Sequence, residues 1–248
     1  MKKQTFVYGS DPVSQSLDIY IPDGKTRAVY VYFHGGGIKR GSRDNCSAPL
    51  MAPYLAERGV ALAVPNYRLY PAAHYPEFIE DGAASVRFVH DFMAKELYCD
   101  KLFVGGASAG AYISMMLCFD IRYLLSVGVN SASVSGYFHD AGQPTAHFSV
   151  LEAEGTDPRR IIIDERAPLY FVGLEEKYPP MRFTVSDNDM AGRYEQIMLM
   201  LNTLSRFGYE GVDYKLMHGG HCKYCNKLDE DGESLYAKMI FDFIGEHI

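Results

Sequence analysis

The strongest constraint on the fold is an alternation of short apolar runs with longer stretches of helical spacing. The runs that predict strands are residues 5–8, 17–21, 28–33, 60–64, 101–105, 124–129, 181–185 and 212–217. Helical spacing appears in residues 49–58, 77–97, 109–119, 194–204 and 235–244. This order predicts an α/β fold with a mostly parallel central sheet and helices on both faces. Ligands of such sheets bind beyond the carboxyl ends of the strands, so the loops that follow strands are the places to seek a site.

Length and composition narrow the class of protein. At 248 residues the chain is expected to form one domain over residues 1–248. Residues 131–180 have no clear pattern, and their aromatics leave two interpretations open: a cap-like insertion over the site, or ordinary packing. A net charge of −7 without a Lys/Arg block argues against nucleic acid as a partner. The sequence gives no indication of the oligomeric state.

The start of the chain and the cysteines bear on its compartment. The N-terminus lacks the apolar core of a signal peptide, and no run of about 18 apolar residues suggests a membrane span. We therefore expect a cytoplasmic protein without a membrane partner. The number of cysteines, five, is odd, and Cys46, Cys99 and Cys118 lie in different segments without disulfide-like spacing, which favours reduced thiols.

The segment Gly106-Ala107-Ser108-Ala109-Gly110 fits the pattern G-x-S-x-G and lies between a predicted strand and a predicted helix. Small neighbours let strand and helix approach closely while the serine stands exposed on a strained turn. The helix that begins at Ala109 also directs free N–H groups toward charge developing beside the serine. We predict Ser108 as a nucleophile, whereas a turn of small residues without chemistry is the simpler alternative.

A second glycine-rich turn, His34-Gly35-Gly36-Gly37, follows the strand predicted at residues 28–33. Its N–H groups are unshielded by a β-carbon, so those of Gly36 and Gly37 could join that of Ala109 in an oxyanion hole. We expect His34 to brace this loop by hydrogen bonding. Lys39, Arg40 and Arg43 come next and could meet an anionic substrate, but a solvated loop is the simpler interpretation.

Three motifs together resemble the bacterial hormone-sensitive-lipase-like esterases and the related small acetyl esterases. They are His34-Gly35-Gly36-Gly37, then Asn66-Tyr67-Arg68-Leu69 with Tyr75-Pro76 and Glu80-Asp81-Gly82, and finally Gly105 to Gly110. The resemblance implies the α/β-hydrolase fold and hydrolysis of short-chain esters without a metal or organic cofactor. Only 33 residues precede the first motif, so we expect a small cap or none.

In this fold the acid follows a late strand and the histidine follows the last strand. The family usually places the acid three residues beyond a small residue at the strand end, which here is Ser186 and selects Asp189. Asp187 is its rival, and the one not used is expected to cap the next helix. His221 after a glycine pair is the expected base, with His218 as its rival.

His218, His221, Cys222 and Cys225 lie close together and could be drawn as a zinc site. Four ligands in one short segment would have to wrap the ion almost alone, and His221 is needed as the base, so we expect no metal. A disulfide between Cys222 and Cys225 would distort the loop of the base, which leaves a redox switch as a hypothesis.

The sequence thus predicts a serine carboxylic-ester hydrolase that acts on short-chain, acetyl-like esters through Ser108, His221 and Asp189. Carbohydrate acetyl esters are the preferred substrates on the resemblance alone. The alternatives are an amide or formamide hydrolase on the same triad, a non-catalytic ligand-binding protein of this fold, and a zinc-dependent regulatory protein.

Overall fold

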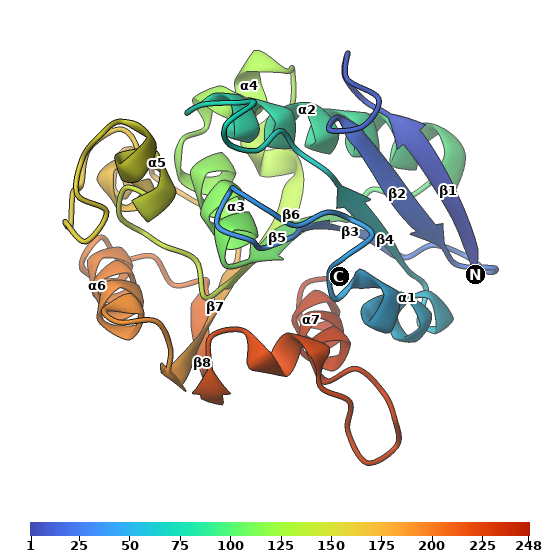
Figure 1. Cartoon of the computed structure of the whole chain (residues 1–248). Coiled ribbons are helices and arrows are strands. Elements are labelled where there is room, and N and C mark those ends of the chain that lie inside the picture. The colour runs from blue at the N-terminus through green and yellow to red at the C-terminus, as the bar shows by residue number, and fades with distance from the viewer.

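The computed structural model describes residues 1–248 and contains an eight-stranded sheet in the order β1-β2-β4-β3-β5-β6-β7-β8 (Figure 1). The strands are β1 Lys2–Val7, β2 Ser16–Ile21, β3 Ala28–Phe33, β4 Val60–Pro65, β5 Leu102–Ala107, β6 Val134–Asp140, β7 Met181–Asn188 and β8 Val212–Gly220. β2 pairs antiparallel with β1 and β4, and all other pairs are parallel. The carboxyl ends of β3 and of β5 to β8 therefore meet at one edge of the sheet.

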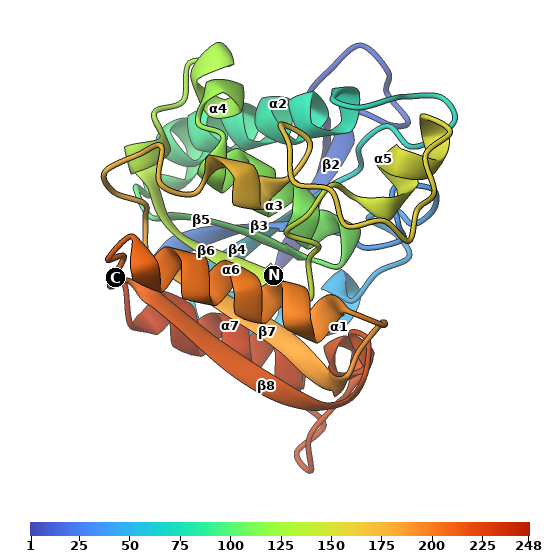
Figure 2. The same cartoon turned by 90° about the vertical axis from the view of Figure 1, so that its left-hand side faces the viewer.

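Seven α-helices accompany the sheet: α1 Ala48–Glu57, α2 Glu77–Phe92, α3 Ala109–Phe119, α4 Arg122–Ser126, α5 Phe148–Ala153, α6 Arg193–Arg206 and α7 Leu235–Gly245. Side chains of α2, α3 and α6 share one buried cluster with the sheet, whereas α1 and α7 share another. Figure 2 shows α2 and α3 on one side of the strands and α1 and α7 on the other. The predicted mostly parallel sheet with helices on both faces is confirmed.

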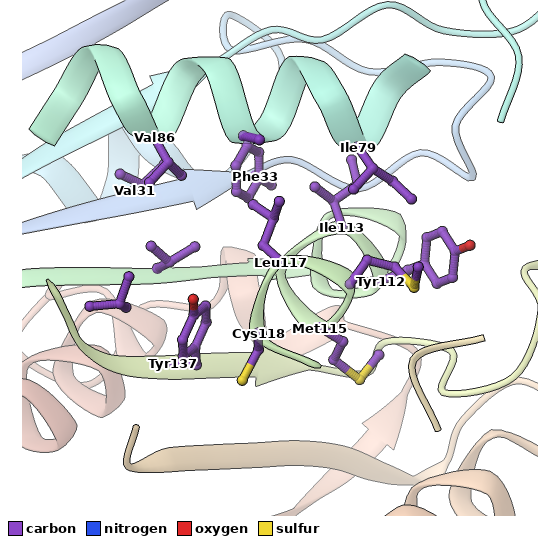
Figure 3. Close-up of a cluster of buried hydrophobic side chains, with 14 of the residues drawn as sticks. Val31, Phe33, Ile79, Val86, Tyr112, Ile113, Met115, Leu117, Cys118 and Tyr137 are labelled. Carbon is purple, nitrogen blue, oxygen red and sulfur yellow. The ribbon is translucent and has the colours of Figure 1, made fainter. Parts of the chain in front are cut away.

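Helix α3 is buried on every side, and this holds the turn before it in place. All its residues from Ala109 to Phe119 are buried, as expected for a helix that is apolar all round. Figure 3 shows Ile113 and Leu117 of α3 among side chains of the sheet and of α2. The contact with α2 is close, because a β-carbon on Gly82 would lie 2.8 Å from Cγ2 of Ile113.

The prediction of a strand at residues 124–129 is wrong. Residues 122–126 form helix α4, and the next strand is β6, Val134–Asp140, between β5 and β7. β6 has a weak apolar signal because it ends in His139 and Asp140, which are fully buried and hydrogen-bonded to Ser114 and Thr184. Residues 134–140 of the range considered as a cap-like insertion therefore belong to the sheet. The predicted helix at 77–97 is α2, which ends at Phe92 and continues as a π-helical turn.

Candidate active site

Ser108 occupies the turn between β5 and α3 with strained backbone angles, φ 56° and ψ −114°. Its N–H donates to the carbonyl oxygen of Asp140 at 2.7 Å, which ties the turn to the end of β6. The flanking glycines are required by close contact with β3. A β-carbon on Gly110 would lie 2.0 Å from the carbonyl oxygen of Phe33, and one on Gly106 would lie 2.6 Å from it.

The ends of β7 and β8 bring an acid and a histidine to this serine. Nε2 of His221 lies 2.8 Å from Oγ of Ser108, and Nδ1 of the same ring lies 2.6 Å from Oδ1 of Asp189. The Asp189 side chain is only 1% exposed and also accepts hydrogen bonds from the N–H groups of Met190 at 2.7 Å and Ser186 at 3.2 Å. The three side chains thus form one continuous line of hydrogen bonds.

The rival residues form a separate pair that does not reach the serine. Nδ1 of His218 lies 2.6 Å from Oδ2 of Asp187, and the His218 side chain is 91% exposed. Asp187 also accepts the N–H of Gly219 at 2.9 Å. The expectation that the second aspartate caps the next helix is wrong, because Gly192 occupies the N-cap position of α6 and Asp187 instead bonds the end of β8.

Asp189 and His221 each stabilise the charged form of the other. Burial opposes ionisation of Asp189, but the hydrogen bond and charge of His221 and the two N–H donors hold the pKa of this carboxyl below its usual value. Burial also opposes protonation of His221, but hydrogen bonds and charge at Asp189, with a contribution from Cys222, raise the pKa of the ring above that of free histidine. Asp189 therefore stabilises an imidazolium at this position.

The His34-Gly35-Gly36-Gly37 loop lies against the serine turn. A β-carbon on Gly35 would lie 3.3 Å from Cβ of Ser108, and Gly36 and Gly37 adopt positive φ angles of 122° and 66°. No protein acceptor takes the N–H of Gly36, Gly37 or Ala109. These free donors beside Ser108 can bind an anionic oxygen.

Tyr67, from the motif Asn66-Tyr67-Arg68-Leu69, packs against this loop and supports it. The ring of His34 is 1% exposed and stacks on Tyr67 at 4.4 Å between centroids. Nδ1 of His34 lies 2.8 Å from the carbonyl oxygen of Gly35. Burial lowers the pKa of His34 to about 4, so the ring is neutral at neutral pH. The expected bracing role of His34 agrees with these contacts.

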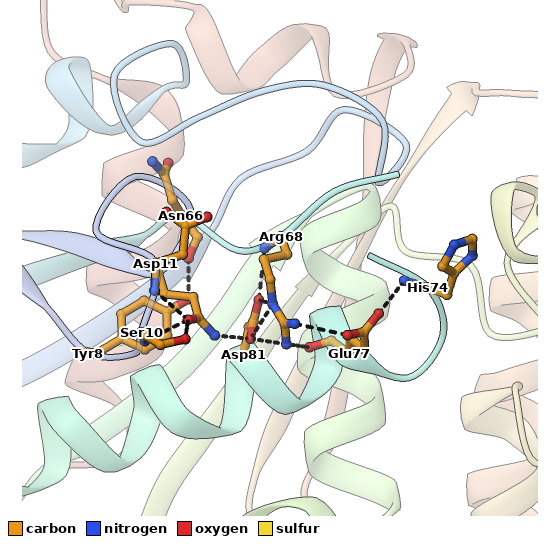
Figure 4. Close-up of polar contacts among 9 residues, drawn as sticks. Tyr8, Ser10, Asp11, Asn66, Arg68, His74, Glu77 and Asp81 are labelled. Atoms are coloured by element: carbon orange, nitrogen blue, oxygen red, sulfur yellow. Dashed lines mark hydrogen bonds and ion pairs between the residues drawn. The ribbon is translucent and has the colours of Figure 1, made fainter. Parts of the chain in front are cut away.

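The contact between Arg68 and Asp81 joins the motif Asn66-Tyr67-Arg68-Leu69 to α2 (Figure 4). The guanidinium of Arg68 contacts both carboxylate oxygens of Asp81 at 2.8–3.1 Å and also bonds Glu77 at 2.9 Å. Asp81 is 2% exposed and further accepts the backbone N–H of Arg68 and the amide of Gln15. The motif is therefore a structural support for the loop above it.

A pocket of about 800 Å³ opens over Ser108 and His221. Its walls include the three glycines of the loop together with Phe148, Met190, Asn45 and Asn226. Lys39 and Arg40 also line it; Lys39 pairs with Glu152 at 2.6 Å, whereas Arg40 has no ion-pair partner. Arg43 is no part of a solvated loop, because its side chain is 17% exposed and lies 3.3 Å from the buried Asp18.

Several residues of the site carry no sequence signal of their own. Phe148 begins α5 and reaches the pocket, and the hydroxyl of Ser149 donates to the carbonyl oxygen of Gly37 at 2.6 Å. The buried Arg193 donates to the carbonyl oxygen of Ala141 at 2.7 Å and so ties the loop after β6 to the start of α6. These contacts join segments far apart in the sequence, which local patterns do not encode.

Asp140, at the end of β6, lies beneath the histidine loop. Its carboxylate accepts hydrogen bonds from the hydroxyls of Tyr224 and Thr184 and from the thiol of Cys225 at 3.1 Å. Burial raises the pKa of Asp140, against the effect of these donors. Cys222 and Cys225 are both free thiols, and Sγ of Cys222 lies 3.7 Å from Nε2 of His221.

Comparison with known proteins agrees with this architecture. Residues 17–123 match the BD-FAE family model. Arylacetamide deacetylase of Bos taurus is 34% identical over 103 residues, which are 39% of this chain and 26% of that protein. A carboxylesterase of Mycobacterium tuberculosis (strain CDC 1551 / Oshkosh) is 36% identical over 91 residues, 36% of this chain and 28% of that protein. The matched part spans less than half the length of these curated relatives.

A solved structure extends the likeness to the whole fold. A truncated carbohydrate esterase from gut microbiota superposes with a TM-score of 0.80 at 23% identity, covering 100% of this chain and 96% of that one. No helix here is both long and apolar enough to cross a bilayer. Residues 17–123 are thus similar to the BD-FAE family, and the shared architecture shows that the chain has the α/β-hydrolase fold.

Proposed function

We propose that this protein hydrolyses carboxylic esters, with Ser108 as the nucleophile, His221 as the general base and Asp189 as the partner of the histidine. The observation that carries the proposal is the line of hydrogen bonds from Oγ of Ser108 through both nitrogens of His221 to Asp189. Free N–H donors stand beside this line, where an ester carbonyl would have to lie. A ligand-binding protein without chemistry would have no need of this alignment.

Each group has one task in the reaction. Nε2 of His221 takes the proton of Ser108 as its oxygen attacks the ester carbonyl, and Asp189 stabilises the imidazolium that forms. The N–H groups of Gly36, Gly37 and Ala109 hold the oxyanion, each donor typically contributing about 10²–10³ in rate. The alcohol leaves with the proton of His221, and water activated by the same ring then releases the acid from Ser108.

The pocket favours small acyl groups and polar alcohols. Phe148 crowds the oxyanion loop, since one of its ring atoms would lie 3.4 Å from a β-carbon on Gly37. Asn45, Asn226 and Arg40 offer polar contacts around the same opening. These polar walls support acetyl-like esters of carbohydrates as the substrates, and a solved protein of the same fold carries the name carbohydrate esterase. We include this substrate class in the proposal.

Amide hydrolysis is the second candidate, because one relative is named a deacetylase of arylacetamides. The same serine, base and oxyanion donors serve both reactions, but an amine leaves less readily than an alcohol. Matched acetyl substrates, p-nitrophenyl acetate and p-nitroacetanilide, separate the two activities. A larger kcat/KM on the ester supports the esterase, and a larger value on the anilide supports the amidase.

The test of the proposal is turnover of p-nitrophenyl acetate, butyrate and octanoate by the purified protein and by Ser108→Ala. We expect turnover that falls with acyl length and is abolished in the variant, with thermal melting to show that the variant is folded. An inert wild-type protein, or a variant as active as the wild type, would contradict the proposed chemistry. Faster turnover of the octanoate would contradict the short acyl preference.

A further inference from the structure

Three potential metal ligands meet directly beside His221. The carboxylate of Asp140 and the thiols of Cys222 and Cys225 place one ligand atom each within 4.8 Å of one another. Asp140 comes from the end of β6, whereas Cys222 and Cys225 belong to the helical turn after β8, so the cluster does not depend on one short segment. Both cysteines line the pocket over Ser108, which gives an ion from solvent a path to them.

We propose that Asp140, Cys222 and Cys225 bind a zinc ion with Nε2 of His221 as the fourth ligand, and that this ion switches the site off. The inhibitory half rests on the proposed esterase function, whereas the binding half does not. Two thiolates, one imidazole and one carboxylate are a ligand set that suits tetrahedral zinc. The ion would reach the cluster from the pocket without opening the fold.

Two distances between neighbouring ligand atoms are close to those of such a site. Zinc bonds of about 2.3 Å to sulfur and about 2.0–2.1 Å to nitrogen or oxygen place tetrahedral neighbours about 3.6 Å apart. Cys222 Sγ and His221 Nε2 are 3.7 Å apart, and Cys225 Sγ and Asp140 Oδ2 are 3.1 Å apart. The Asp140, Cys222 and Cys225 atoms are already within 4.8 Å of one another, whereas Nε2 of His221 lies outside this group and would have to turn toward the ion.

The surroundings supply the supports that metal ligands need. A histidine that binds a metal through one nitrogen usually donates its other N–H to a carboxylate, as Nδ1 of His221 does to Asp189. The hydroxyls of Tyr224 and Thr184 hold the Asp140 carboxylate in place. Binding would release the thiol protons to solvent, including the one that Cys225 now shares with Asp140.

Zinc and catalysis would compete for a single pair of electrons. The lone pair on Nε2 of His221 must be free to take the proton of Ser108, which lies 2.8 Å away. A zinc ion bonded to this nitrogen occupies that lone pair, so the serine keeps its proton. Removing the ion restores the base.

The binding half is tested in Ser108→Ala, which keeps all four ligands and removes turnover. With a phosphine reductant present, Co²⁺ is titrated as a spectroscopic substitute and then displaced by Zn²⁺. We expect one Co²⁺ per chain, with the near-ultraviolet charge-transfer band of thiolate ligands. Adding Cys225→Ser should weaken the band and raise the zinc dissociation constant at least about tenfold. Adding Cys46→Ser is the matched control, since Cys46 lines the same pocket outside the cluster.

No thiolate band, or a band unchanged by Cys225→Ser, would overturn the site. Because serine at position 225 could disturb packing, Asp140→Asn provides a second variant, and it should also weaken zinc binding. A zinc affinity unchanged from that of Ser108→Ala in both variants would overturn the ligand assignment.

The inhibitory half is tested by ester turnover, with each protein compared with its own metal-free rate. Zinc should inhibit the wild type and a chelator should reverse it, while Cys225→Ser should need at least about tenfold more zinc. If Co²⁺ binds at the cluster but Zn²⁺ does not lower ester turnover, the proposed switch is overturned. A metal-free wild type that hydrolyses no ester contradicts the proposed function instead, and the cobalt titration still decides the site.

Discussion

The hydroxyl of Tyr67 donates a hydrogen bond of 2.7 Å to the carbonyl oxygen of His34, and the two rings stack on each other. The contact joins the loop after β4 to the oxyanion loop after β3. It supports the backbone just before the glycines that line the pocket, although Tyr67 itself does not line it.

Tyr67→Phe should keep the stacking but lose this buried hydrogen bond. We expect the free energy of unfolding, measured with urea, to fall by about 1 kcal/mol, because the carbonyl oxygen of His34 is left without this donor. The looser loop should lower kcat more than it changes KM, since the donors act on the transition state. Tyr194→Phe on α6 is the control, as this ring is 37% exposed. Equal kcat in both variants would contradict the bracing role.

Asp189→Asn and Asp187→Asn form a matched pair, since both aspartates bond a histidine at 2.6 Å but only His221 reaches Ser108. Asp189→Asn should lower kcat by about 10⁴, because the amide cannot stabilise the imidazolium. Asp187→Asn should have a small effect. Similar losses in the two variants would mean that the acid has been assigned to the wrong residue.

The pH dependence follows from the same contact. Turnover requires neutral His221, so the rate is lost as pH falls through the pKa of this ring. The Asp189 carboxylate raises that pKa, and removing its charge should lower it. The acid limb of Asp189→Asn should therefore lie at lower pH than that of the wild type. A limb shifted to higher pH would contradict this electrostatic account.

Gly36→Ala should collapse the oxyanion loop. A β-carbon there would lie 1.9 Å from the carbonyl oxygen of Arg40, at a φ of 122° that alanine rarely adopts. We expect kcat to fall by at least about 10², the typical effect of one lost oxyanion donor. Gly24→Ala, where nothing lies within 4 Å, should leave kcat and the melting temperature unchanged. Wild-type turnover in Gly36→Ala would exclude the loop from catalysis.

Asp81→Asn should destabilise the fold, whereas the adjacent Glu80→Gln should not. Asp81 is 2% exposed and accepts several hydrogen bonds from Arg68 and Gln15, while Glu80 is exposed. The neutral amide offers one acceptor fewer and leaves Arg68 less well paired, at a cost of about 1–3 kcal/mol. Urea unfolding measures the difference, and equal midpoints would contradict the structural role of the motif.

Local patterns predicted most of the fold because buried parallel strands here are apolar runs and the outer helices are amphipathic. Strand β6 was not predicted because its end is polar. The polar side chains there form hydrogen bonds with partners distant in the sequence, such as Ser114 and Thr184. The parts of the site with special backbone conformations could be predicted from glycine patterns, as at Gly36 and Gly110. The position of Asp140 could not be predicted, because only the register of β6 beside β5 and β7 brings it under the histidine loop.

The choice between the two Asp/His pairs also depended on more than spacing. Asp187 lies near the end of β7 and Asp189 just beyond it, and the pairing with β8 shifts register between Ser186 and Asn188, where an exposed carboxylate is followed by a buried one. Sequence alone predicts that one aspartate serves the base, and the three-dimensional register shows which one contacts His221.

The most direct test of the central claim is covalent labelling of the serine. The protein is treated with a fluorophosphonate and examined by intact-mass and peptide mass spectrometry. We predict one adduct per chain on the peptide that contains Ser108, absent from Ser108→Ala and formed much more slowly in His221→Ala. No adduct, an adduct at another serine, or equal labelling of His221→Ala would contradict the claim that His221 activates Ser108.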